Sequence, residues 1–180
     1  MADWIYVDNS NVFIEGKRVS AVRDGYALDV YDAMENRILD NDWRMSFGKL
    51  YEFVAGKNNN ETARAMLFGS RPPDNDAIWN IARQAGFEVI TQDRNAANKE
   101  KKIDTGIVAA MTRDAYRNAD IGDTFTIVSG DGDYLPAVEQ LISDGFTVDV
   151  VFWDHASQEL KDACSTFTSL NPHLDLLRIQ

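Results

Sequence analysis

The chain has 180 residues, which fits one domain, and 44% of them are apolar, which is enough to build a buried core. Eighteen basic and 29 acidic residues give a net charge of −11, which excludes the basic surface typical of a passive nucleic-acid coat. A role with nucleic acid would therefore depend on local features or on a bound cation. The single cysteine, Cys164, excludes an intrachain disulfide and favours a reducing cytoplasm. No stretch is apolar for long enough to predict a signal peptide or a membrane span.

The first half of the chain alternates strand-like and helix-like segments. In chain order we expect a strand at Trp4–Val7, a helix at Leu28–Leu39, a helix within Phe47–Val54, a strand at Ala63–Phe68, a helix capped by Asp74 or Asp76 that ends at Ala85, and a strand at Phe87–Thr91. Gly56–Asn60 has the composition of a loop.

The second half continues the same rhythm. We expect a loop at Gln92–Lys102, a helix at Ile103–Asn118, a strand at Thr124–Ser129, a helix at Tyr134–Ser143, a strand at Phe146–Trp153, a helix from Ser157 to about Cys164, and a short mixed tail. Alternating strands and helices predict an α/β fold with a mostly parallel sheet and helices on both faces. No stretch resembles a linker, so residues 1–180 are predicted to form a single domain.

Carboxylates follow two of the predicted strands. Asp8-Asn9-Ser10-Asn11 comes after the first strand, and Ser129-Gly130-Asp131-Gly132-Asp133 comes after the strand at Thr124–Ser129. Ligands of open parallel sheets bind beyond the carboxyl ends of the strands. If these two strands are neighbours, we expect Asp8, Asp131 and Asp133 to converge there.

Each of these residues also has a purely structural interpretation. Asp133 is well placed to cap the helix at Tyr134–Ser143, which has Pro136 in its first turn. Asp8 and its neighbouring asparagines are typical of Asx-turns at strand ends. Capping and metal binding do not exclude each other.

Asp104 favours the metal interpretation. It begins a helical stripe that continues with Ile107, Val108, Met111 and Ala115 and is otherwise apolar, where a lone carboxylate would be costly to desolvate. The alternative is that it interacts only with the helix dipole, worth about 0.3–1 kcal/mol. Two carboxylates about 4 Å apart repel by about 4 kcal/mol at an effective dielectric constant of about 20, so converging acids need shared protons or a cation. An all-oxygen set suits Mg²⁺ or Mn²⁺, and one cysteine with two separated histidines does not suit zinc.

Three motifs together resemble a known family. Asp8-Asn9-Ser10-Asn11, Lys102-Ile103-Asp104 and Ser129-Gly130-Asp131-Gly132-Asp133-Tyr134, in this order, resemble the NYN domain, in the LabA-like branch of the PIN-like nuclease superfamily, over roughly Ile5 to Leu170. The resemblance implies a PIN-like three-layer sandwich in which Asp8, Asp104, Asp131 and Asp133 surround Mg²⁺ or Mn²⁺. It implies endonucleolytic hydrolysis of RNA that leaves 5′-phosphate ends. Asn11 would orient Asp8 or a water of the metal, and Ser129 would contact the substrate phosphate.

Single-stranded RNA is the expected partner, and no membrane contact is expected. The sequence leaves open whether the protein forms a homo-oligomer. Lys101 and Lys102 lead into Asp104 and would contact RNA phosphates, although a charge run is more often a solvated loop. Among the aromatic residues, Tyr134 and Trp153 lie beside strand ends and are the candidates for stacking on bases.

The sequence departs from the family pattern at Ala110, where many members carry a further aspartate six residues after the equivalent of Asp104. Asp114 lies further along the helix and is a poor replacement. This departure and the negative charge keep two alternatives open: a non-catalytic RNA-binding or regulatory protein of the same fold, and a Toprim-like phosphohydrolase that depends on Mg²⁺. Ser10, where a haloacid-dehalogenase phosphatase needs an aspartate, argues against that class.

Overall fold

The structure is a computed structural model that describes residues 1–56, 61–71, 76–93 and 99–179. The strands are β1 (Asp3–Asp8), β2 (Thr62–Arg71), β3 (Glu88–Asp93), β4 (Thr124–Val128), β5 (Thr147–Phe152) and β6 (Thr166–Ser169). The helices are α1 (Asn9–Arg23), α2 (Val30–Glu35), α3 (Phe47–Ala55), α4 (Ala77–Ala85), α5 (Lys99–Arg117), α6 (Leu135–Ser143) and α7 (Gln158–Ala163). Two short 3-10 helices, η1 (Gly132–Tyr134) and η2 (Asn171–His173), complete the described elements.

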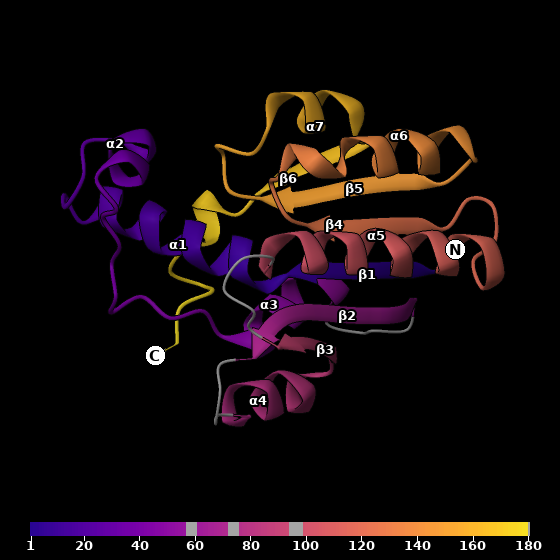
Figure 1. Ribbon diagram of the computed structural model, residues 1–180, viewed down its shortest axis with the longest axis horizontal. Coiled ribbons are helices and arrows are strands. Elements are labelled where there is room, and N and C mark those ends of the chain that lie inside the picture. The colour runs from indigo at the N-terminus through magenta and orange to yellow at the C-terminus, as the bar shows by residue number, and fades with distance from the viewer. Residues whose placement is uncertain (57–60, 72–75, 94–98, 180) are drawn as a thin grey trace.

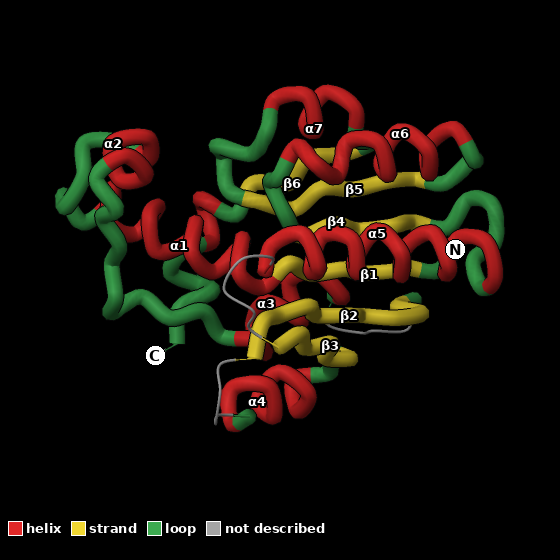
Figure 2. Tube along the Cα trace, in the orientation of Figure 1, coloured by secondary structure: helices red, strands yellow, loops and turns green. Residues whose placement is uncertain are grey.

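The strands form one sheet in the order β3-β2-β1-β4-β5-β6, and every pairing between neighbours is parallel. Figure 1 shows α5 and α6 in front of the sheet and α3 behind it. In Figure 2 the red tubes of α5 and α6 overlie the yellow strands of the sheet. The predicted three-layer α/β architecture with helices on both faces is confirmed.

The sheet separates two hydrophobic cores. Successive residues of a strand point to opposite faces, and β1 shows this clearly. Trp4 and Tyr6 pack with residues of α5, α6 and α7, whereas Ile5 and Val7 pack with residues of α1, α3 and α4. All four side chains are buried, so the central strand is buried from Trp4 to Val7 and ends in the polar group Asp8.

Helix α1 occupies a stretch in which the sequence predicts only a turn at its start. The reason is the composition of its buried face, which is made of Asn9, Val12, Glu15, Gly16, Ser20 and Ala21. Because half of these residues are polar and one is glycine, the helix shows no apolar periodicity. Asp8 caps the helix by accepting a hydrogen bond from the Asn11 amide at 3.2 Å, so the expected turn is the first turn of α1.

The helix expected over Leu28–Leu39 is much shorter, and its expected apolar face is wrong. Helix α2 begins after Asp29, whose side chain accepts hydrogen bonds from the Tyr31 and Asp32 amides. It ends before Arg37, which takes a φ of 56° and so breaks the helical path. Leu28 and Tyr31, expected on the buried face, are 91% and 69% exposed.

Two further boundaries differ from the prediction. The tail expected to be mixed contains β6, which extends the sheet by pairing with β5. Helix α5 begins at Lys99 rather than at Ile103, so part of the expected loop is helical. Asp76 stands at the N-cap of α4, and Asp74, the other candidate cap, lies outside the described residues.

Gly16 allows α1 to lie directly on two indole rings. A Cβ at this position would come within 2.5 Å of Trp43 and 2.7 Å of Trp153, closer than real side chains approach. The two rings meet edge to face with their centroids 5.8 Å apart, and the Trp153 indole donates to the Val12 carbonyl. This contact fixes α1, and with it the start of the helix at Asp8, against the sheet.

Cys164 is half-buried and packs at the edge of the core beside α7. Burial raises the pKa of its thiol, in agreement with the packing role expected from its neighbours. Among the described residues, no helix combines the length and the apolar character needed to cross a membrane.

Candidate metal centre

The centre of the sheet is the point at which the strand order changes direction. From β1 the chain adds β2 and β3 on one side, and then adds β4, β5 and β6 on the other. The carboxyl ends of β1 and β4 therefore border the crevice in which open α/β sheets bind ligands. Residues Asp3–Val7 of β1 pair with Thr124–Val128 of β4, so the two acidic turns that follow these strands are neighbours, as the sequence predicts.

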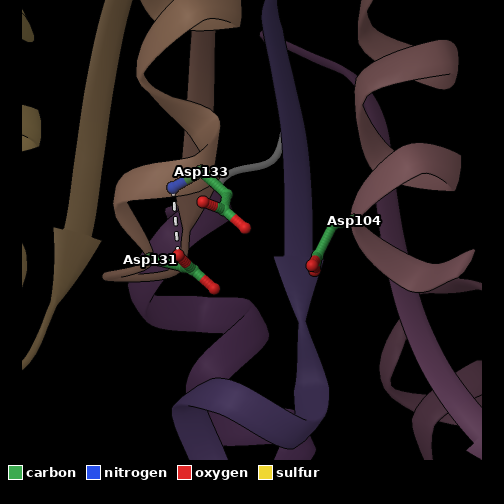
Figure 3. Close-up of side chains that lie close together, drawn as sticks. All are labelled: Asp104, Asp131 and Asp133. Carbon is green, nitrogen blue, oxygen red and sulfur yellow. Dashed lines mark hydrogen bonds between the residues drawn. The ribbon is translucent and has the colours of Figure 1, made fainter. Parts of the chain in front are cut away.

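Three carboxylates meet at this crevice. Asp104 comes from α5, and Asp131 and Asp133 come from the turn after β4. Each offers an oxygen that lies within 4.8 Å of the oxygens of the other two. Figure 3 shows Asp131 and Asp133 directed from the turn toward Asp104, with the Asp133 amide donating to Asp131 Oδ1 at 3.0 Å. The geometry supports the expectation that these three residues form one cluster.

Asp8 adjoins this cluster but is not one of its three members. Asp8 is only 5% exposed, and the Tyr134 hydroxyl, with one proton shared between two acceptors, lies 3.3 Å from its Oδ2 and 3.0 Å from Asp104 Oδ1. Burial raises the pKa of Asp8 to about 6, and the charges of Asp104 and Asp131 add to the rise, against the hydrogen bonds from Asn11 and Tyr134. The capping role foreseen as the alternative for Asp8 therefore coexists with a place beside the acidic cluster.

Tyr134 links the two parts of the site. Its ring is fully buried, and burial together with the nearby charges of Asp8 and Asp104 raises the pKa of its hydroxyl. The hydroxyl is thus kept protonated, so that it serves as a donor to carboxylates. Tyr134 and Trp153 are both 0% exposed, and the expectation that they stack on bases is wrong for this structure.

Asn11 and Ser129 connect the two acidic turns. Asn11 Oδ1 accepts from the Ser129 hydroxyl at 2.8 Å and from the Gly130 amide at 3.0 Å. These bonds hold the first turn of α1 against the turn that carries Asp131. Ser129 is fully buried, which corrects the expectation that it touches a substrate phosphate: its hydroxyl orients Asn11 instead.

The cleft beside the cluster has a volume of about 420 Å³. Its lining is Asp8, Ser10, Asn11, Ile14, Glu15, Arg18, Ser70, Ile103, Asp104 and Asp131. Asp133 is exposed and borders a neighbouring, mostly apolar groove between α5 and α6. Lys101 and Lys102 lie in α5, but the structure does not describe their side chains. Their expected phosphate contacts therefore stay a prediction.

Ala110, where the sequence departs from the family pattern, lies in the apolar core under α5. It lies six residues beyond Asp104, about 9 Å along the helix axis at 1.5 Å per residue, and is buried among the apolar residues under α5. An aspartate at this position would stand apart from the three clustered carboxylates. Asp114 is further away still and is fully buried, where it accepts hydrogen bonds from Tyr6 and Arg64 and supports the fold.

Sequence reasoning missed three polar residues beside the site. Glu15 forms an ion pair with Arg18, and Glu15 Oε2 lies 2.7 Å from His155 Nε2. The spacing of Asn11, Glu15 and Arg18, at four and seven residues, places them on one side of a helix. That signal appears only when α1 is recognised as beginning at Asn9.

Comparison with known proteins agrees with this architecture. The family model described as the NYN domain matches residues 4–171. A crystal structure of a protein of unknown function from Vibrio parahaemolyticus is similar, with a TM-score of 0.67 and 23% sequence identity over 94% of this chain and 92% of that chain. At this identity the likeness concerns the fold alone. Among curated proteins, none matches the chain significantly.

Proposed function

The chain belongs to the NYN domain family, and from this membership we propose that it is a metal-dependent ribonuclease that hydrolyses internal phosphodiester bonds of RNA. The family lies within the PIN-like nuclease superfamily, so a nuclease is the activity to expect of the site. The observation that carries the proposal is the meeting of Asp104, Asp131 and Asp133 at the point where the strand order reverses.

The donor set fits a hard divalent cation. Three carboxylates that offer oxygens within 4.8 Å of one another repel strongly unless a positive charge lies between them. Mg²⁺ and Mn²⁺ prefer such oxygen ligands and keep positions open for water and phosphate. When bound, the ion supplies neutralisation of the phosphate charge and a lower pKa for the attacking water.

The side chains of the site have two roles, holding the cation and positioning the carboxylates. Asp104, Asp131 and Asp133 would hold the cation, and Asp8 would join them as the fourth carboxylate expected from the sequence. Its pKa of about 6 belongs to a site without a cation, and a positive charge would lower it. The Tyr134 hydroxyl lies between Asp8 and Asp104 within hydrogen-bonding distance of both and holds the two carboxylates in place, while Asn11 keeps the two acidic turns together.

The net charge supports one alternative, a non-catalytic RNA-binding or regulatory protein of the same fold. With a net charge of −11, the protein has little general attraction for RNA, which favours a binding or regulatory role at selected sites. Membership of the NYN family favours a nuclease over the Toprim-like phosphohydrolase.

The test is cleavage of labelled single-stranded RNA in Mn²⁺, in Mg²⁺ and in EDTA. We expect cleavage only with a metal, and we expect Asp104→Asn and Asp131→Asn to reduce it by about a hundredfold or more, since even outer-sphere partners of a metal cost about 10–100-fold. The matched control is Asp162→Asn, which makes the same change at an exposed aspartate of α7. Binding without cleavage in every metal would support the regulatory alternative, and cleavage that survives both variants and EDTA would exclude the metal mechanism.

A further inference from the structure

Arg18 is the one cation among the described residues that line the acidic cleft. The same lining carries the carboxylates of Asp8, Glu15, Asp104 and Asp131. RNA enters such a cleft only if positive charge meets its phosphates. The Arg18 side chain is 21% exposed, so part of it is accessible from the cleft.

The face of α1 that borders the cleft leads from the metal centre to Arg18. Asn11, Ile14, Glu15 and Arg18 follow one another at the spacing of a single helix face, and all four line the cleft. Arg18 is seven residues beyond Asn11, about 10 Å along the helix axis. The guanidinium is therefore placed beside the metal centre rather than at its reacting atoms.

Arg18 is held from one side by a buried pair. Its Nη1 forms an ion pair with Glu15 Oε1, and Glu15 Oε2 lies 2.7 Å from His155 Nε2. Glu15 is 8% exposed, and the ring of His155 meets the ring of Phe152 edge to face. A guanidinium that is already oriented loses less conformational freedom when it binds a ligand.

The hydrogen bonding of Arg18 is also incomplete. Its Nε is buried and meets no acceptor among the described residues. A guanidinium presents its donors in a planar fork that matches the oxygens of a phosphate. Arg18 therefore has donor capacity that Glu15 does not use.

We propose that Arg18, positioned by Glu15 and His155, binds a phosphodiester of the RNA strand next to the one cleaved at the metal centre. The inference rests on the proposed ribonuclease function for the identity of the strand. It gives Arg18 a binding role and Glu15 a positioning role, and it explains how an acidic protein holds RNA at an acidic cleft.

The experiment measures binding of a fluorescein-labelled single-stranded RNA oligonucleotide by anisotropy, in Ca²⁺, over a series of NaCl concentrations. The variants are Arg18→Gln, which keeps a donor for Glu15 but removes the charge, and Arg18→Lys, which keeps the charge but loses the fork. The matched control is Lys17→Gln, because Lys17 is adjacent on α1, does not line the cleft, and interacts with Asn41 and Phe13.

We expect Arg18→Gln to bind about tenfold more weakly, the loss typical of one charged hydrogen bond. The slope of log K against log salt concentration should become shallower by about 0.7, which is the contribution of one phosphate contact in a single strand. Arg18→Lys should keep the slope and bind with intermediate affinity, and Lys17→Gln should resemble the wild type in both. A merely structural role of Arg18 would lower affinity without changing the slope.

The outcomes separate this inference from the proposed function. If the wild type cleaves RNA but Arg18→Gln keeps its affinity and slope, the Arg18 inference fails and the ribonuclease stands. If the wild type binds RNA without cleaving it and the slope changes as expected, the ribonuclease fails and the phosphate site stands. Equal losses of RNA affinity in Arg18→Gln and Lys17→Gln, or no RNA binding by the wild type, would overturn the inference.

Discussion

Asp8 is a carboxylate of the site whose surroundings oppose its charge. It is buried at the end of the central strand, close to the charges of Asp104 and Asp131, and burial raises its pKa to about 6 from the ordinary value of 3.8. Two donors partly offset this, the Asn11 amide and the Tyr134 hydroxyl. The metal-free protein therefore carries a destabilising charge at neutral pH.

The first prediction concerns the stability of the metal-free protein as a function of pH. Because the pKa of Asp8 is higher in the folded than in the unfolded chain, this residue binds more protons in the folded state between about pH 3.8 and 6, and its contribution to stability falls as pH rises through this window. Asp8→Asn keeps the cap of α1 and removes the charge. We expect the free energy of unfolding of Asp8→Asn to increase relative to that of the wild type between pH 4 and pH 7, by up to about 3 kcal/mol.

Urea unfolding in EDTA at several pH values measures this gain. The matched control is Asp29→Asn, which changes another N-cap aspartate in the same way at an exposed position on α2. This control reports the cost of changing an N-cap aspartate that is not buried. A constant difference between Asp8→Asn and the wild type from pH 4 to pH 7 would contradict the proposed cost of burial.

At the scale of single elements, α1 and α5 explain how far the sequence could predict the site. The apolar stripe of α5 is strong, so Asp104 could be placed at its start and toward the core side. The buried face of α1 holds Asn9, Glu15 and Ser20, and these polar residues hid the helix. The bond between Asn11 and Ser129 and the role of Glu15 and Arg18 could not be predicted because they depend on that helix.

The second prediction concerns the close contact of α1 with the sheet. Alanine is favoured over glycine inside helices by about 1 kcal/mol. At Gly16, however, the added methyl group would strike Trp43 and Trp153, so we expect Gly16→Ala to destabilise the protein by about 1–3 kcal/mol. Gly106 of α5 is the matched control, since a Cβ there lies at an ordinary 3.7 Å from Phe68.

Thermal unfolding of the two variants provides the measurement. Gly106→Ala should unfold at the same temperature as the wild type or higher, and Gly16→Ala should unfold at a lower temperature. If Gly16→Ala is as stable as Gly106→Ala, α1 is free to move away from the indole rings, and the close packing inferred for this helix is absent.

At the scale of the whole molecule, the predicted fold class is confirmed because it rests on the alternation of strong segments. Ile127-Val128 and Val148–Phe152 are apolar runs typical of strands covered on both faces, and both became inner parts of the sheet. Strand β6 was missed because its sequence Thr-Phe-Thr-Ser is short and has only one apolar residue. The order of strands could not be predicted from the sequence pattern, and it is this order that brings Asp131 to Asp104.

The third prediction concerns the response of the whole protein to a divalent ion. A ligand that binds only the folded state at a hundred times its dissociation constant stabilises it by about 2.7 kcal/mol. For a chain of this size this corresponds to a rise in Tm of about 5–10 °C in saturating Mn²⁺. Because the protein carries a net charge of −11, part of any rise could come from general screening, which NaCl at matched ionic strength corrects.

Asp104→Asn and Asp131→Asn should lose most of this rise, whereas Asp162→Asn, a change at an exposed aspartate of α7, should keep it. An equal rise in all of these proteins would mean that Mn²⁺ acts through the general surface charge, and the carboxylate cluster would then not be its site.

The central position of β1 has a consequence for the newly synthesised protein. This strand leaves the ribosome before both of its neighbours, yet it pairs with residues 62–68 on one side and 124–128 on the other. Such distant pairings make folding slow compared with that of helical proteins. Until β4 has emerged and docked, Asp131 has no fixed place beside Asp104, so a nascent or truncated chain has no complete carboxylate cluster. Any activity of this site therefore begins only after the second half of the sheet has assembled.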